Sequence, residues 1–150
     1  MAATNLLKPP AVAPGQDMTE MVHRASYWAK SPSITYASTT PAELFSVPAN
    51  TMIVDLVAHK SVAMDASTSA DVVITLGDSD DVDRFMAGSD FDGANVGFRS
   101  MKMAESSNQV GQGGHVYTSA GLITATLAVD DSSNGTFVVY CQYVPYSDEL

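Results

Sequence analysis

Two short apolar runs constrain the fold of this chain more than any other feature. Residues 52–58 and 72–76 are rich in β-branched side chains, and a polar segment of Ser, Thr and Asp separates them. A short apolar run bounded by turn-forming residues is typical of a buried β-strand. The stretch from 42 to 76 therefore predicts two strands joined by a loop, and we expect this pair to seed the core of a β-sandwich.

The composition agrees with a predominantly β chain. Ser, Thr, Val, Gly and Asp are plentiful, whereas Lys, Arg, Glu and Leu, which usually fill helix surfaces, are scarce. A chain of 150 residues is long enough to form one domain without disulfides or metal ions. We therefore expect a single β domain, and we find no repeat at a fixed period.

Alternating apolar and polar residues place the other strands. The strands that this pattern predicts are 33–38, 43–47, 98–104, 116–117, 121–129 and 136–144. Turn chemistry at Pro48 and Asn50 predicts a reversal before the strand at 52–59, and residues 77–97 read as a long loop. Asn134 and Gly135 lie between the last two strands and predict a hairpin there. The pattern as a whole predicts an all-β fold, an antiparallel β-sandwich or jelly-roll-like domain.

Alternation also predicts which side of each strand faces the core. In the strand at 52–59, Met52, Val54, Leu56 and Ala58 share one face, which is purely apolar. The other face mixes polar and apolar residues. We therefore expect the first face to lie on the core.

The N-terminal segment differs from this pattern. Prolines at 9, 10 and 14 and the absence of a strand or helix period predict an extended arm over residues 1–32, preceding the sandwich domain at 33–150. Asp17, with Glu20 three residues later, would cap a short helical turn over residues 17–30 of this arm. The arm is either a loose chain end or a segment held on a neighbouring subunit. The residues that we expect to contact a partner are Leu6, Leu7, Pro9, Pro10, Tyr27 and Trp28; packing on the domain's own body is the alternative for the two aromatic residues.

Charge and apolar content exclude several classes of function. Lys and Arg total 7 and Asp and Glu total 17, a net charge of −10 that disfavours binding to nucleic acid. No apolar run approaches the roughly 20 residues of a membrane helix, and the N-terminus lacks the pattern of a secretory signal. We therefore expect a soluble chain with neither nucleic acid nor membrane as a partner. The single cysteine, Cys141, lies in an alternating run and is expected to be a buried apolar residue.

An acidic cluster is the strongest candidate for chemistry. Carboxylate oxygens are the ligands that Ca²⁺ prefers, and the weak candidate cation site is Asp78, Asp80, Asp81 and Asp83, with Asp90 and Asp92 downstream. The spacing does not match an EF-hand. The alternative is a solvated loop in which Asp side chains cap turns, or a loop that meets a basic partner.

No other pattern indicates a catalytic or cofactor site. His23, His59 and His115 are too widely spaced for a zinc motif, and the chain has neither a G-x-S-x-G elbow nor a phosphate-binding loop. We expect no cofactor and no enzymatic activity.

Residues 33–90 carry a resemblance to a known family. A short strand ends at Val47, Pro48, Ala49 and Asn50, and a later strand is closed by Gly77, Asp78, Ser79, Asp80 and Asp81, followed by Phe85. This arrangement resembles small structural proteins encoded in the virion-morphogenesis regions of tailed bacteriophages.

The resemblance implies a capsid decoration or cement protein. Such a protein would bind the major capsid protein lattice and itself as a homodimer or homotrimer, would lie on the capsid surface of the virion, and would be made in the host cytoplasm. Two alternatives remain: a tail- or fibre-associated β-module, and a cation-dependent carbohydrate-binding sandwich or hydrolase with its ion in the acidic loop.

Overall fold

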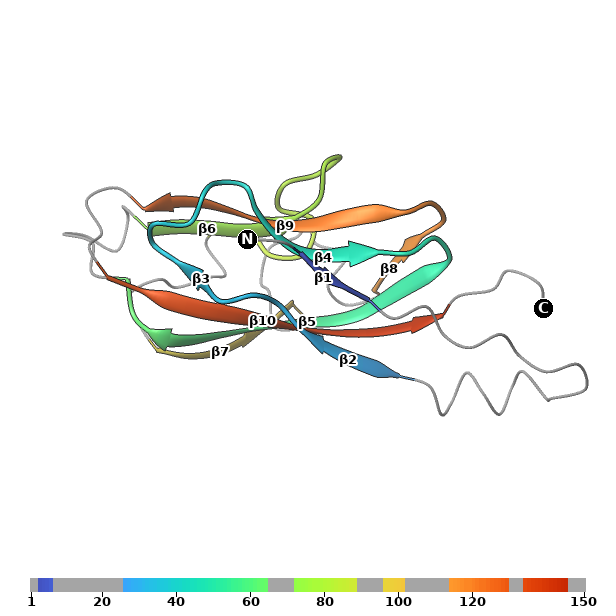
Figure 1. The fold of residues 1–150 in the computed structure, drawn as a ribbon, viewed down its shortest axis with the longest axis horizontal. Coiled ribbons are helices and arrows are strands. Elements are labelled where there is room, and N and C mark those ends of the chain that lie inside the picture. The colour runs from blue at the N-terminus through green and yellow to red at the C-terminus, as the bar shows by residue number, and fades with distance from the viewer. Residues whose placement is uncertain are drawn as a thin grey trace, which may run out of the picture.

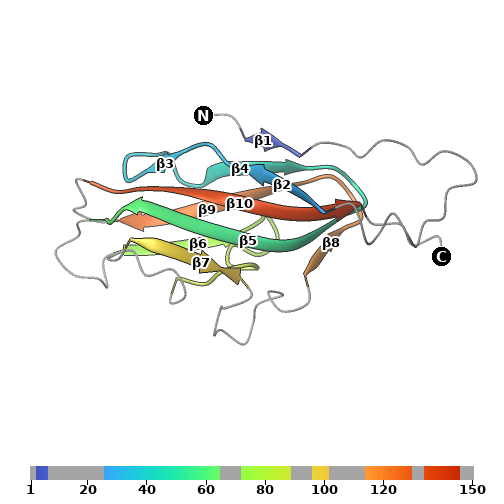
Figure 2. The same cartoon turned by 90° about the horizontal axis from the view of Figure 1, so that it is seen from below.

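In the part of the chain that the structure describes, ten strands form two sheets that face each other (Figures 1 and 2). The computed structural model describes residues 3–6, 26–64, 72–88, 96–101, 114–129 and 134–145. In chain order the strands are β1 (Thr4–Asn5), β2 (Tyr27–Lys30), β3 (Ile34–Thr35), β4 (Ala42–Val47), β5 (Thr51–Val62), β6 (Val72–Gly77), β7 (Gly97–Ser100), β8 (His115–Tyr117), β9 (Gly121–Val129) and β10 (Thr136–Pro145). Within the described segments, no helix has the length and apolarity to span a membrane.

The four-stranded sheet has the order β1-β4-β9-β6, and the six-stranded sheet has the order β2-β10-β5-β7. In the six-stranded sheet β3 also pairs with β10 and β8 also pairs with β5. Every ladder between these described strands is antiparallel except the short one between β1 and β4. The predicted class, an all-β antiparallel sandwich, is confirmed, and the strand order is compatible with a jelly roll.

The core lies between the sheets and is filled by the inward side of each strand. Ile123 and Ala125 from β9 and Phe137 and Val139 from β10 have no exposed surface beyond 1%. Burying a side chain such as Ile or Phe contributes about 1.5–3 kcal/mol each, so this layer supplies most of the stability. Cys141 is buried and free, as predicted.

The predicted hairpin between the last two strands is wrong, although both strands are present. β9 pairs with β4 and β6 in the four-stranded sheet, whereas β10 pairs with β2, β3 and β5 in the other sheet. The apolar sides of β9 and β10 therefore face each other across the core. Gly135 does supply the predicted positive φ, at 133°, but at a crossing between sheets.

The predicted core face of β5 is correct for one half of the strand only. Leu56 and Ala58 are buried, but Ile53 is buried in place of Met52 and Val54. The pairing with β10 shifts by one residue between Asp55 and Ile53, which is a β-bulge. An extra residue in a strand reverses the side on which the following residues point, so simple alternation fails at this point.

The turn at Pro48–Asn50 is confirmed, with Asn50 at a φ of 57°. It connects β4 to β5 and so carries the chain from one sheet to the other. The apolar runs at 52–58 and 72–76 lie in β5 and β6, in opposite sheets. They face each other across the core, as expected of a pair that seeds a sandwich.

The segment predicted as an arm contributes two strands to the sheets. β1 pairs with β4, and β2 pairs with β10. Residues 27–30 are therefore extended, not helical; the remainder of the predicted helical turn lies outside the described residues. Strands of two and four residues are too short to produce a recognisable alternation in the sequence.

Candidate functional site

The acidic loop after β6 is folded around one carboxylate. Asp78 Oδ1 accepts hydrogen bonds from the backbone amides of Asp80 and Asp81, each at 3.0 Å. The Asp78 amide in turn donates to the Asp81 carbonyl at 2.9 Å. A β-carbon at Gly77 would lie 2.2 Å from that carbonyl oxygen, so a glycine is needed where the loop closes. The loop is thus a turn capped by an Asp side chain.

The other oxygen of this carboxylate reaches across the sandwich. Asp78 Oδ2 accepts a hydrogen bond from the Tyr117 hydroxyl at 2.9 Å and forms an ion pair with Arg84 Nε at 2.7 Å. Tyr117 lies on β8, in the six-stranded sheet, whereas Asp78 directly follows β6 of the four-stranded sheet. The contact therefore ties the two layers together at the acidic loop.

The environment keeps Asp78 ionised. Burial alone would raise its pKa, but hydrogen bonds from Tyr117, Arg84 and the Asp80 amide outweigh this effect and lower the pKa below 3.8. Burial, followed by the bond to Asp78, raises the pKa of the Tyr117 phenol. The buried phenol is thus a hydrogen-bond donor to a charged carboxylate, an arrangement that stabilises structure.

His115 completes the cluster through its ring. The imidazole packs edge-on against the rings of Tyr117, at 4.7 Å, and Phe85, at 5.9 Å between centroids. Burial lowers the pKa of His115, and the positive charge of Arg84 lowers it further. Neutral His115 therefore packs as an aromatic ring beside the Asp78 carboxylate.

The four predicted cation ligands do not converge. Asp78 uses both oxygens within the protein, and the loop leaves Asp80 exposed. A hydrogen bond with Asp81 raises the pKa of Asp83. Among the described residues, no group of three or more His, Cys, Asp or Glu side chains is close enough to share a metal ion. Asp90 and Asp92 lie outside the described residues.

The structure separates the residues predicted to contact a partner. Leu6 is 4% exposed and packs in the core, with its amide bonded to the Ser46 carbonyl at 3.1 Å. Tyr27 is half-buried and its ring stacks on that of Tyr143 at 5.6 Å. Trp28 points the other way and is 54% exposed. Leu7, Pro9 and Pro10 lie outside the described residues, and their role stays a prediction.

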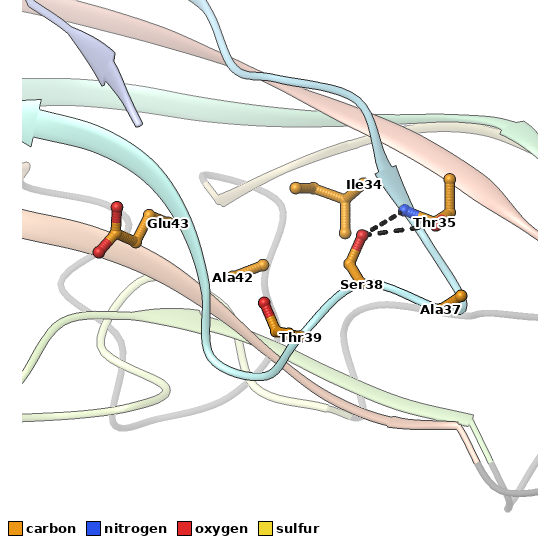
Figure 3. A pocket seen from close by; sticks show the side chains of 7 residues that line it. All are labelled: Ile34, Thr35, Ala37, Ser38, Thr39, Ala42 and Glu43. Carbon is orange, nitrogen blue, oxygen red and sulfur yellow. Dashed lines mark hydrogen bonds between the residues drawn. The ribbon is translucent and has the colours of Figure 1, made fainter. Parts of the chain in front are cut away.

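A shallow pocket lies between β3 and β4 (Figure 3). Its volume is about 330 Å³, at the lower end for ligand pockets. The lining residues are Ile34, Thr35, Ala37, Ser38, Thr39, Ala42 and Glu43. The Thr35 amide donates to Ser38 Oγ at 3.0 Å, which fixes the turn at the rim. Glu43 is the one titratable side chain in this lining, so the pocket does not pair an acid with a base.

Sequence reasoning missed the partners of Asp78. Asp78 was a candidate as one of a cluster of carboxylates, but Tyr117 and Arg84 carried no signal of their own. The detectable signal was local: a Gly followed by Asp at the end of a strand is typical of a tight, side-chain-capped turn.

The known proteins were compared by sequence and by fold. No family model matches the sequence, and no curated protein matches it. A chain in the acidic stable capsid structure of Helicobacter pylori bacteriophage KHP30 superposes with a TM-score of 0.60 at 16% identity, covering 81% of this chain and 89% of that chain. A chain of the cyanophage Pam1 capsid asymmetric unit superposes with a TM-score of 0.54 at 14% identity, covering 95% of this chain and 98% of that chain. The protein therefore has the fold of chains found in two bacteriophage capsids.

Proposed function

We propose that this protein is a structural component of a bacteriophage virion, a decoration or cement protein that binds the major capsid protein lattice and stabilises the head. The observation that carries the proposal is the likeness in fold to chains of the KHP30 and Pam1 capsids. The turns at residues 47–50 and 77–81, which resemble those of small structural proteins of tailed bacteriophages, support the proposal from the sequence.

The extent of the likeness supports an accessory role. Each comparison covers most of both chains, and for the Pam1 chain it covers nearly all of both. The likeness is therefore to whole chains of similar length and not to one part of a larger subunit. A small sandwich suits a module added to a shell at its outer surface.

The polar cluster also suits a structural protein. Asp78 accepts a hydrogen bond from Tyr117 and forms an ion pair with Arg84, and these contacts hold a loop between two sheets. An active-site carboxylate needs an oxygen free to meet a substrate, whereas both oxygens of Asp78 already accept hydrogen bonds. This supports the expectation that the protein is not an enzyme.

The test is binding to capsids of the encoding phage that have been prepared without this protein. Purified protein would be titrated onto unexpanded and expanded particles, and copies per particle would be counted by mass spectrometry and cryo-electron microscopy. We expect saturation at a fixed multiple of the capsid symmetry and a higher rupture temperature of the coated particle. Binding to tails in place of heads would favour the tail-associated alternative, and failure of the folded protein to bind any particle would overturn the proposal.

The arm can be tested in the same assay. A variant with Leu7→Ala, Pro9→Ala and Pro10→Ala should bind fewer copies or dissociate faster if these residues contact the lattice. Val82→Ala is the matched control, since Val82 is an exposed apolar residue in the acidic loop. Equal binding of both variants would remove the arm from the interface.

A further inference from the structure

One outer side of the sandwich is covered with aromatic and aliphatic side chains. Phe137, Val139 and Cys141 of β10 point into the core, so the alternate residues of this strand point outward from the six-stranded sheet. The ladder register places outward residues of β2, β5 and β7 beside them. The aromatic and aliphatic members of this side, called here the aromatic face, are Trp28, Val57, His59, Phe98, Val138 and Tyr140. Gln142, which pairs with Trp28, lies on the same side.

The aromatic face extends from one edge of the sheet to the other. Trp28, on β2, is 54% exposed, and Phe98, on β7 at the opposite edge, is 67% exposed. Phe98 lies flat on His59, with ring centroids 4.1 Å apart and an interplanar angle of 10°. Val57 pairs with Tyr140, and His59 pairs with Val138, in the middle of the sheet. Large contiguous apolar patches on a protein surface mark sites of interaction.

The outer side of the four-stranded sheet is different. Thr75 and Thr126 are paired across β6 and β9, and Thr124 pairs with Glu43 of β4. Val73 of β6 is 41% exposed on this side, and the Thr75 hydroxyl is buried. The two outer sides of the sandwich thus differ in chemistry, and the aromatic face is the one suited to a partner.

The charges on the aromatic face indicate which partner. Lys30 on β2 and Asp55 on β5 are the charged side chains that point outward among the described residues of this sheet, so the face is neutral. The Ser100 hydroxyl lies 2.8 and 3.0 Å from the two oxygens of Asp55 and holds that carboxylate in place. The whole chain carries a net charge of −10. Two copies of so acidic a chain repel each other unless they meet through a surface without excess negative charge.

We propose that two copies of this chain associate through the aromatic face, related by a two-fold axis. The axis lies in the plane of the face, midway between Lys30 and Asp55 and perpendicular to the line that joins them. It therefore places Lys30 of each copy opposite Asp55 of the other copy. The pair of opposite charges then forms twice, as a self-complementary interface requires.

The size of the face is adequate for such a contact. β5 and β10 have 12 and 10 residues, β2 and β7 have 4 each, and β8 and β3 have 3 and 2. At about 3.3 Å per residue and about 4.8 Å between strands, the sheet covers roughly 550 Å² in projection. A stable interface buries about 800 Å² of accessible surface on each partner, and accessible surface exceeds its flat projection. This inference concerns self-association in solution and does not depend on the proposed capsid role.

The test is the mass of the full chain in solution, measured by sedimentation equilibrium at several concentrations. We expect a dimer whose dissociation constant rises at least about tenfold in each of Trp28→Ala, Lys30→Glu and Asp55→Lys. Val82→Ala should leave the dissociation constant of the dimer unchanged. Circular dichroism and thermal melting would verify that each variant is folded.

Mixing two variants identifies the partner as a second copy. Lys30→Glu leaves two negative charges on the face and Asp55→Lys leaves two positive charges, so each alone repels itself. An equimolar mixture should restore a heterodimer with close to the original dissociation constant, because both charge pairs form again. A monomer at every concentration, a wild-type oligomer that these substitutions leave unchanged, or a mixture that stays monomeric would overturn the proposal.

Discussion

Tyr117 donates a hydrogen bond to the buried carboxylate of Asp78 at 2.9 Å and thereby connects a strand of one sheet to the loop that follows a strand of the other. Arg84 neutralises the same carboxylate from within the loop. Arg84, from within the loop, and Tyr117, 39 residues after Asp78, therefore meet at one oxygen atom, and the conformation of the acidic loop depends on them.

Removing this hydroxyl should destabilise the protein. Tyr117→Phe is expected to lower the free energy of unfolding by about 1.5–3 kcal/mol, the range for a hydrogen bond to a charged group. Urea unfolding followed by fluorescence measures the change. Tyr36→Phe is the control, since Tyr36 is exposed, and should stay within about 0.5 kcal/mol of the wild type. Equal midpoints for the two variants would show that the contact contributes nothing.

The stability should fall in mildly acidic solution because of His115. Burial and Arg84 lower the pKa of His115 in the folded protein, so below pH 6.5 the unfolded chain binds a proton that the folded protein does not. This contribution to the free energy of unfolding is present above pH 6.5 and is lost as the pH falls through the lowered pKa of His115. Asp78 acts in a lower window, since its stabilisation is present above pH 3.8 and is lost below it.

Unfolding free energies measured from pH 8 to pH 3 would resolve these windows. In His115→Phe, which keeps an aromatic ring between Phe85 and Tyr117, the decline that begins near pH 6.5 should be reduced. A profile identical to that of the wild type would show that His115 does not cause the decline.

Leu6 should contribute to folding, although it lies close to the N-terminus. It is buried in the core and its amide is bonded to β4, so Leu6→Ala is expected to cost about 2–5 kcal/mol. Val82→Ala, at an exposed position, should cost no more than about 0.5 kcal/mol. Thermal unfolding compares the two. If Leu6→Ala melts like Val82→Ala, the packing of Leu6 is not needed for folding.

Gly135 and Gly97 form a matched pair that separates backbone strain from steric conflict. Their φ values are 133° and 134°, so alanine is strained equally at both. A β-carbon at Gly135 would lie 2.0 Å from the sulfur of Met64, whereas at Gly97 it meets nothing within 4 Å. Gly135→Ala should therefore be less stable than Gly97→Ala by roughly 1–3 kcal/mol, the usual cost of overpacking. Adding Met64→Ala should narrow the difference between the two glycine variants.

The strands could be predicted from the sequence because burial on one side produces alternation within a single segment. The ranges expected for β4, β9 and β10 agree with the structure to within about a residue at each end. The partner of each strand could not be predicted in this way. β9 and β10 need one apolar side each whether they form a hairpin or lie in two facing sheets. The connection of six residues between them is also compatible with both arrangements.

The limits of the site prediction have a similar cause. Alternation failed at Ile53 because a bulge depends on the pairing with β10, and the network at Asp78 depends on Tyr117, which is distant in sequence. The charged pair on the aromatic face likewise becomes visible only when the ladder register is known. A local sequence pattern depends on residues that are close together in the chain, whereas these features depend on which residues an adjacent strand of the sheet contributes.

The position of the last two strands has a consequence for how the chain folds as it is synthesised. β9 is central to one sheet and β10 to the other. The Ser31 hydroxyl accepts a hydrogen bond from the Val139 amide, 108 residues later in the chain, so this bond cannot form until β10 has been synthesised. Loop closure over such separations slows folding, so neither sheet can assemble until the C-terminal third has left the ribosome. A nascent chain arrested before β9 would expose the apolar sides of β4, β5 and β6 together, and the final strands would act as the step that commits the whole protein to its fold.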